Sequence, residues 1–216
     1  FDYMEGEEVT HISQTTTDND FGSVQLDASF GTHQLVFVGH NSGSCEYDGS
    51  SLSFDKVTDT FSYATSLTVN DETEAQNITL NRQIGKLTLY VNDAIPENAA
   101  KMIITVNGYS NELNPITGKG SEGFEFTKEF TYNESHIGTT KSNYHLYSFI
   151  PSDGYEVDVN IRVVDTNGDN ICNRDVTEVP LRKNQQTTIR GSLFTAGLKA
   201  GITISYQWDD TVNLEL

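Results

Sequence analysis

Several residue types that would point to a particular class of protein are scarce in this sequence of 216 residues. It has only two cysteines, Cys45 and Cys172, which are too few for a disulfide framework. We expect two free thiols, because we assign these cysteines to different domains. No run approaches the roughly 18 apolar residues of a membrane-spanning helix. The first residues, FDYMEGEEVT, also lack the basic and apolar regions of a signal peptide.

Basic residues are also scarce. The sequence has 13 lysine and arginine residues against 31 aspartate and glutamate residues, which gives a formal net charge of −18. A nucleic-acid-binding surface needs a basic patch to neutralise phosphates, so we predict no nucleic-acid partner. Anionic lipid would not attract this surface by charge either. A solvated acidic surface is typical of a secreted or cell-surface protein.

Helical periodicity is nearly absent as well, and short runs rich in Val, Ile, Thr, Phe and Tyr alternate with turn residues. This pattern predicts an all-β fold built from antiparallel β-sandwiches. The clearest alternation is YEVDVNIRVVD, in which every second residue from Tyr155 to Val163 is apolar. The predicted strands cover residues 22–27, 33–39, 51–55, 61–69, 76–81, 84–92, 101–107, 124–130, 144–150, 155–165, 187–194 and 202–208.

The polar loop DETEAQN, residues 71–77, separates a more polar first part of the chain from a second part with stronger alternation. We place a domain boundary shortly after it and predict two β-sandwich domains, residues 1–81 and 82–216. Both segments are within the plausible size range of folded units. Whether the first strand of the N-terminal domain lies upstream of Phe1 stays open.

The nearest approach to a metal motif is DTNGDN, Asp165 to Asn170, which offers oxygens at alternate positions as a calcium loop does. Its glycine stands at the fourth position instead of the sixth, and the closing glutamate is missing, so a hairpin turn is the better interpretation. We predict no metal site and no cofactor. The histidines lack helical zinc spacing, and we expect all of them on the surface or on strand faces: His11, His33, His40, His136 and His145.

No arrangement of residues supports catalysis. GKGSEG, Gly118 to Gly123, misses the Gly-x-Ser-x-Gly pattern of a nucleophile elbow because Lys119 stands where a glycine is needed, and we predict a flexible loop there. Carboxylate pairs such as Asp209 and Asp210 arise by chance in an acidic chain, and neighbours on a strand face opposite sides. We therefore predict no catalytic residues and no enzyme activity.

Aromatic residues could form a platform for glycans, since rings stack on sugar faces. In two-sheet proteins, however, most aromatic residues fill the interior, and Tyr206 and Trp208 share the spacing of a core face with Ile202 and Ile204. We favour a role in the core and keep glycan binding as the rival interpretation. The residues concerned are Tyr109, Tyr132, Tyr144, Tyr147, Tyr155 and Trp208.

Two segments carry a family resemblance: ITLNRQIGKLTLYVNDAIPENAAKMIITVNG with the following LNPITG, and VPLRKNQQTTIRGSLF. They resemble the fimbrillin superfamily of Bacteroidetes, especially its fimbrial-anchor-like surface lipoproteins. The resemblance covers most of the predicted second domain, and the first domain matches only loosely, through THQLVFVGHN. The matching motif positions are Leu80, Arg82, Ile84, Gly85, Lys86, Leu87, Ile95 and Pro96 in the first segment, and Asn184, Thr187, Thr188 and Gly191 in the second.

This resemblance implies two transthyretin-like β-sandwich domains in tandem, a lipid-modified cysteine on the precursor, and a position on the outer membrane or in a fimbrium. It also implies assembly by strand exchange, because an incomplete sheet exposes unpaired backbone groups that a strand from a neighbouring subunit can fill. The lipidated cysteine of the family is missing from this sequence.

Our main functional hypothesis is a non-enzymatic fimbrial or adhesin-type structural subunit of a bacterial surface, with other fimbrial subunits as partners. The rival is a glycan-binding surface lipoprotein of a polysaccharide-uptake system, and a hydrolase comes third. Exposed aromatic residues gathered in one loop cluster would favour the rival. The sequence assigns no residue to an assembly groove or to a binding site.

Overall fold

The structure is a computed structural model that describes residues 1–140, 142–195 and 201–205, the last range as backbone only. Every regular element in these ranges is a β-strand, which confirms the all-β prediction. The strands are β1 Asp2–Met4, β2 Glu7–Thr10, β3 Gly31–Gly39, β4 Cys45–Tyr47, β5 Leu52–Phe54, β6 Phe61–Val69, β7 Asn81–Arg82, β8 Ile84–Val91, β9 Ala99–Tyr109, β10 Glu112–Asn114, β11 Lys119–Gly120, β12 Phe124–Thr131, β13 Ser142–Phe149, β14 Glu156–Asp165, β15 Asn170–Pro180, β16 Gln186–Gly191 and β17 Gly201–Ser205.

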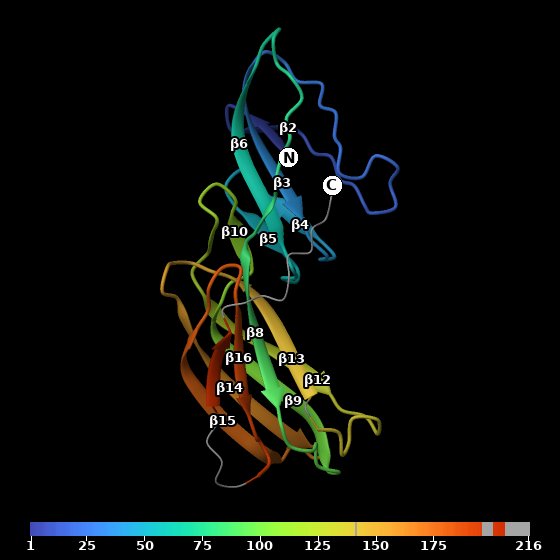
Figure 1. Cartoon of the computed structure of the whole chain (residues 1–216), viewed down its shortest axis with the longest axis vertical. Coiled ribbons are helices and arrows are strands. Elements are labelled where there is room, and N and C mark those ends of the chain that lie inside the picture. Colours follow the sequence, from blue (N-terminus) through green and yellow to red (C-terminus); the bar gives the residue numbers. More distant parts are fainter. Residues whose placement is uncertain (141, 196–200, 206–216) are drawn as a thin grey trace.

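The molecule is elongated and has two halves that lie end to end (Figure 1). The upper half holds a sheet of order β2-β1-β3-β6-β7 and a second sheet of order β11-β10-β5-β4. The lower half holds two further sheets, β12-β9-β14-β15 and β13-β8-β16-β17. The neighbouring strands β8 and β16 run parallel, and the other described pairs are antiparallel.

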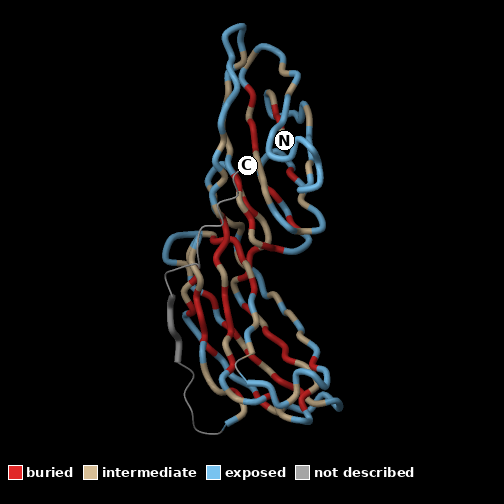
Figure 2. The backbone as a smooth tube through the Cα atoms, turned by 45° about the vertical axis from the view of Figure 1, so that its right-hand side comes forward, coloured by how far each residue is buried: buried red, intermediate tan, exposed pale blue. Residues whose placement is uncertain are grey.

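The lower half holds more of the buried residues, as the red stretches of its strands show in Figure 2. The alternation predicted on β14 is borne out, because Val157, Val159, Ile161 and Val163 are each at most 2% exposed. Buried residues of both halves belong to one connected apolar cluster. In that cluster Phe54 of the upper half packs against the lower half, with its ring centroid 5.1 Å from that of Phe149.

Two predicted strands are wrong. Residues 22–27 form no strand and lie in a long exposed segment between β2 and β3, and of residues 76–81 only Asn81 joins a strand, β7. β1, β2, β4, β10 and β11 were not predicted, because strands of two to four residues are too short for alternation to mark them. The 11-residue β15 is also missing from the predicted strand ranges, although the hairpin interpretation of Asp165 to Asn170 implied a strand after the turn. Tyr206 and Trp208 lie outside the described residues.

Two strands that follow the predicted domain boundary belong to the upper half. β10 pairs with β5 through Glu112 and Leu113, and β11 pairs with β10. The predicted loop at Gly118 to Gly123 is therefore partly wrong, since Lys119 and Gly120 form β11. The division into domains 1–81 and 82–216 stays a prediction about units that fold independently.

The turn and the thiols follow the sequence predictions. Asp165 and Asn170 bound the hairpin between β14 and β15, and the Asp165 carboxylate accepts the N–H groups of Asn167 and Asp169. Cys45 and Cys172 are both free thiols. No helix among the described residues is long and apolar enough to cross a membrane.

Candidate functional site: the joint and the N-terminal surface

The two halves meet at a polar joint centred on Arg82. Its guanidinium forms a fork with the Asp59 carboxylate, at 2.7 Å from Nε and 3.0 Å from Nη2, and its Nη1 donates to Asn184 Oδ1 at 3.1 Å. The Arg82 side chain is only 8% exposed and also lies over the ring of Phe61, 4.8 Å from its centroid. A planar fork on a carboxylate fixes direction as well as distance. Arg82 therefore holds segments of both halves in one orientation.

The loop before β16 completes the joint from the lower half. Asn184 has a positive φ of 56°, a conformation that asparagine tolerates better than most residues, and its N–H donates to the Ile84 carbonyl at 2.8 Å. Gly85 passes so close to this loop that an added Cβ would lie 2.9 Å from the Arg182 carbonyl oxygen. Motif positions 82 and 84 thus contact position 184, about 100 residues later in the sequence, and position 85 approaches the same loop at Arg182.

Gln83 and Lys183 add further hydrogen bonds across the joint. The Gln83 N–H donates to the Thr60 carbonyl at 2.9 Å, and its side-chain amide donates to the Ser62 carbonyl at 3.2 Å. Lys183 Nζ donates to Gln83 Oε1 at 3.2 Å. Because Gln83 is only 7% exposed, these bonds are shielded from water and fix the entry of the chain into β8.

A second set of motif residues holds the far end of β8. Ile95 is 2% exposed, and its N–H and C=O both bond to the loop that follows β12. Asp93 accepts the N–H groups of Leu193, Phe194 and Thr195 at 2.8–3.0 Å, which ends β16 three residues earlier than predicted. Burial raises the pKa of Asp93, but these N–H donors outweigh it and lower the pKa overall. Asp93 was not singled out in the sequence.

Several of the remaining motif residues are buried or hydrogen-bonded. Leu87 and Thr187 are buried, the Gly191 carbonyl accepts the N–H of Asn92, and Thr187 donates to the Pro180 carbonyl. Thr188 is 8% exposed, Lys86 lies on the outer face of β8, and Leu80 and Pro96 are half-buried. Their membership of a family motif stays a prediction.

Replacing Arg82 by lysine is expected to lower the free energy of unfolding by about 1–2 kcal/mol. Lysine keeps the charge but loses the fork on Asp59 and the bond to Asn184. Urea unfolding of Arg82→Lys measures the effect, and Arg162→Lys on the outer face of β14 is the matched control. Equal stabilities of the two variants would show that the joint does not depend on the fork.

The N-terminal segment, residues 9–30, contains most of the exposed large apolar side chains among the described residues, and we call it the N-terminal surface. Isolated exposed apolar residues are ordinary, but a concentration of them marks a surface that meets another molecule. Five of the eight large hydrophobic residues that are exposed lie between positions 9 and 30: Val9, Ile12, Phe21, Val24 and Phe30. Phe30 is 67% exposed.

An open strand edge lies in the same half. β6 pairs with β3 along its whole length, whereas β7 covers only Phe61 and Ser62 on the other side. From Tyr63 to Val69 the outer backbone groups of β6 have no ladder partner among the described strands. Such an edge can accept a strand from another chain.

A buried ion pair ties β1 to β3 beneath this surface. His33 Nδ1 lies 2.8 Å and 3.0 Å from the two carboxylate oxygens of Asp2, and Nε2 donates to the Ser29 carbonyl at 2.9 Å. Both ring nitrogens face acceptors, so the imidazole is protonated. His33 lies on β3, as the prediction of surface or strand-face histidines allows, but on its buried face, where it is 1% exposed.

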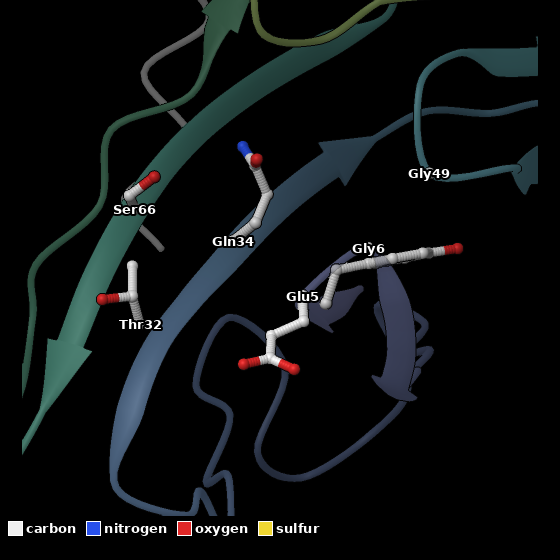
Figure 3. A pocket seen from close by; sticks show the side chains of 7 residues that line it. Glu5, Gly6, Thr32, Gln34, Gly49 and Ser66 are labelled. Carbon is white, nitrogen blue, oxygen red and sulfur yellow. The ribbon is translucent and has the colours of Figure 1, made fainter.

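A shallow pocket of about 210 Å³ opens beside the β1–β2 hairpin. Figure 3 shows Thr32 and Gln34 of β3 and Ser66 of β6 on one side, with Glu5 and Gly6 of the hairpin turn on the other. Burial and a hydrogen bond to Glu8 raise the pKa of Tyr3, which also lines the pocket, to about 12. No cation lines this pocket, so its chemistry suits a small neutral or positively charged polar group.

The tyrosines considered for a glycan platform and the metal-ligating residue types were located among the described residues. The described residues contain no group of three or more His, Cys, Asp or Glu side chains that could hold a metal ion. Of the tyrosines considered for a glycan platform, Tyr109 and Tyr132 are buried and Tyr144, Tyr147 and Tyr155 are half-buried. They pack against or within the core, as the favoured interpretation predicts.

Comparison with known proteins adds a family and a fold. A family model described as a family of unknown function, DUF6562, matches residues 31–215. No curated protein matches the sequence. Among solved structures, a "putative adhesin" of Bacteroides ovatus matches with a TM-score of 0.51 at 10% identity, over 72% of this chain and 69% of that chain.

Two further solved structures match less closely. A "putative adhesin" of Bacteroides thetaiotaomicron has a TM-score of 0.47 at 9% identity, over 84% of this chain and 80% of that chain. The fimbrial anchor protein Mfa2 of Porphyromonas gingivalis has a TM-score of 0.38 at 12% identity, over 76% of this chain and 68% of that chain. The Bacteroides ovatus structure therefore shares the fold of this chain.

Proposed function

The chain belongs to DUF6562, a family of unknown function. We propose that it is a fimbrial or adhesin-type structural subunit of a bacterial cell surface. In this proposal the protein works through protein–protein contacts and is not an enzyme. The cell-surface location, the lipid anchor and the outer-membrane placement are parts of the same proposal, and the last two rest on the family resemblance alone.

The observation that carries the proposal is the surface of the upper half. The N-terminal surface exposes five large apolar side chains, and the nearby sheet ends in an open edge from Tyr63 to Val69. The open edge offers unpaired backbone groups to an added strand, and the exposed apolar segment of the same half offers a further contact for a neighbouring subunit. The names of the structurally similar proteins, adhesins and a fimbrial anchor, point the same way.

The joint supports a mechanical role. A subunit in a surface assembly is pulled along its length, so its two halves must not separate easily. Here β10 and β11 extend an upper sheet with chain that comes from the lower half, and Arg82 and Gln83 bond across the boundary. These contacts support a subunit that transmits force as one body.

The proposal predicts a heat-labile ladder of assemblies. When material sheared from native cells is left unboiled, a denaturing gel with a specific antibody should show multiples of the subunit that collapse on heating. Strand exchange buries a whole strand and its hydrogen bonds, and such contacts dissociate slowly in detergent. A single monomer band under all conditions would contradict assembly and would favour a binding protein that never extends.

A pair of variants locates the interface. Phe30→Asp places a charge in the N-terminal surface and should abolish the ladder, while Ile116→Asp, at a position that is 54% exposed in the turn between β10 and β11, should preserve it. Neither change touches the core, so both proteins should fold. A ladder that persists in Phe30→Asp would show that the N-terminal surface is not the assembly interface.

A further inference from the structure

The pocket beside the β1–β2 hairpin is lined by oxygen acceptors. Tyr3, Gln34 and Ser66 stand opposite one another in one row across β1, β3 and β6. Thr32, two residues before Gln34, lies on the same face of β3. Glu5, in the hairpin turn, lines the other side of the pocket (Figure 3). Hydroxyl, amide and carboxylate oxygens therefore surround a space of about 210 Å³.

Three of these polar side chains are not used by the protein itself. Glu5, Gln34 and Ser66 make no side-chain hydrogen bond or ion pair among the described residues. Thr32 Oγ1 lies 3.1 Å from Thr68 Oγ1. A hydroxyl oxygen has two lone pairs, so Thr32 can accept a further hydrogen bond. A group that enters the pocket with several donors would find acceptors on both sides.

Glu5 has a backbone conformation that glutamate does not favour. The turn between β1 and β2 consists of Glu5, with a φ of 54°, and Gly6, with a φ of 87°. Positive φ at both positions is typical of a two-residue hairpin turn in which asparagine, aspartate and glycine are preferred. A residue held in a sparsely populated conformation is a reason to ask for a function. In this position Glu5 contributes a carboxylate to the wall of the pocket.

The charge of the N-terminal part of the chain favours a cationic ligand. Residues 1–55 contain ten aspartate and glutamate residues and no lysine or arginine. The summed field of such a segment attracts cations and repels anions. Among the described residues that line the pocket, one is a carboxylate and none is a cation. A positively charged group is therefore the ligand that both the pocket and its surroundings favour.

The number of carboxylates separates an ammonium group from a metal ion. Glu5 supplies the only carboxylate among the described residues that line the pocket. Calcium takes roughly six to eight oxygen ligands, commonly with several carboxylates among them. A primary ammonium group carries one charge and three N–H donors, which matches one carboxylate and several neutral acceptors. The volume is below the roughly 300–1,000 Å³ of pockets that enclose a whole ligand, so it suits the end of one side chain.

We propose that this pocket binds a primary ammonium group, and that a lysine side chain of the protein that meets the upper half supplies it. The ammonium group donates to the Glu5 carboxylate on one side and to oxygens of Gln34, Thr32 or Ser66 on the other. The choice of a partner lysine rests on the proposed function, whereas ammonium binding does not. The matching partner surface carries apolar side chains as well as the lysine, because the N-terminal surface in the same half is apolar.

Titration of the isotope-labelled chain with N-α-acetyl-lysine methylamide, followed by NMR, tests the pocket. At low salt we expect saturable shifts of the backbone amide signals of Gly6, Thr32 and Ser66, and weaker binding in roughly 0.5 M NaCl. The same compound acetylated on its side-chain nitrogen keeps the stem but loses the charge, and it should leave these signals in place. Equal shifts with both compounds would overturn ammonium recognition, and so would equal shifts with calcium chloride.

Replacing Glu5 by asparagine separates binding from folding. Asparagine suits this turn, so thermal unfolding should show a variant at least as stable as the wild-type protein. Its dissociation constant for the lysine derivative should rise at least about fivefold, because the charge-assisted hydrogen bond is lost. Glu7→Gln removes one charge from the opposite face of the same hairpin and should bind like the wild-type protein. Unchanged affinity in Glu5→Asn would overturn the proposal, and so would an equal loss in Glu7→Gln.

The ladder of assemblies tests the source of the ammonium group. Native cells that carry Glu5→Asn should give a weaker heat-labile ladder than cells that carry Glu7→Gln. A full ladder in Glu5→Asn, together with lost binding of the lysine derivative, would overturn a partner lysine and favour a free amine as the ligand. If the wild-type protein gives no ladder, the proposed function fails and the partner lysine with it, while the titration still decides whether the pocket binds an ammonium group.

Discussion

Replacing Phe149 by alanine is expected to lower the free energy of unfolding by about 3–5 kcal/mol. Phe149 ends β13 in the lower half, is 0% exposed and packs against Phe54 of the upper half. Gly120 of β11 lies so close that an added Cβ would meet the Phe149 Cβ at 2.9 Å. Removing the ring leaves a cavity between closely packed strands of both halves, and those strands cannot collapse to fill it.

Chemical unfolding in urea measures this loss, and Phe124→Ala provides the matched control. Phe124 lies on β12 and is 43% exposed, so its truncation should cost far less than that of Phe149. A double-mutant cycle with Phe54→Ala then measures the coupling between the halves. We expect less than additive losses, because each ring is the partner of the other. Additive losses would show that the two rings stabilise their own halves independently.

Replacing Asp2 by alanine is expected to cost a similar amount, about 3–5 kcal/mol, because it leaves a buried charge without its partner. Asp2 is 2% exposed and His33 is 1% exposed. The hydrogen bond to Asp2, followed by the bond to the Ser29 carbonyl, raises the pKa of His33 despite its burial. Double replacement by Asp2→Leu/His33→Leu should be much milder than Asp2→Ala, since it removes both charged groups.

The same pair gives stability a dependence on pH with a definite sign. The pKa of His33 is higher in the folded protein than in the unfolded chain, where it is about 6.5. Its contribution is therefore complete below about pH 6.5 and is lost as the pH rises through the raised pKa of the folded state. Urea midpoints measured from mildly acidic to alkaline pH should fall in the wild-type protein. The fall should be smaller in His33→Gln, and identical pH profiles would contradict a protonated His33.

Phe149 at the joint and the Asp2–His33 pair together hold the upper half in place. Phe149 and the joint fix it to the lower half, and the Asp2–His33 pair fixes β1, with its hairpin to β2, onto β3. The N-terminal surface and the open edge of β6 lie on this supported framework. A partner that binds there would therefore meet a fixed surface, and less ordering would be needed on binding.

The sequence by itself determined the all-β fold class and most of the longer strands. Alternation from residue 155 to residue 165 predicted both β14 and its buried face, because the period of a strand is a local property that adjacent residues display. The hairpin at Asp165 and the free thiols follow in the same way from local residues. The motif positions at 80–96 and 184–191 indicated a family before their surroundings were known.

Only the tertiary structure decided which distant residues meet. Arg82 and Asn184 lie 102 positions apart, and neither the fork on Asp59 nor the close approach at Gly85 has a local signal. His33 looks like an ordinary strand residue until Asp2 is placed beside it. Pairing between sheets and burial of charge depend on which chain segments the fold brings together, and a pattern read along neighbouring residues does not contain that information.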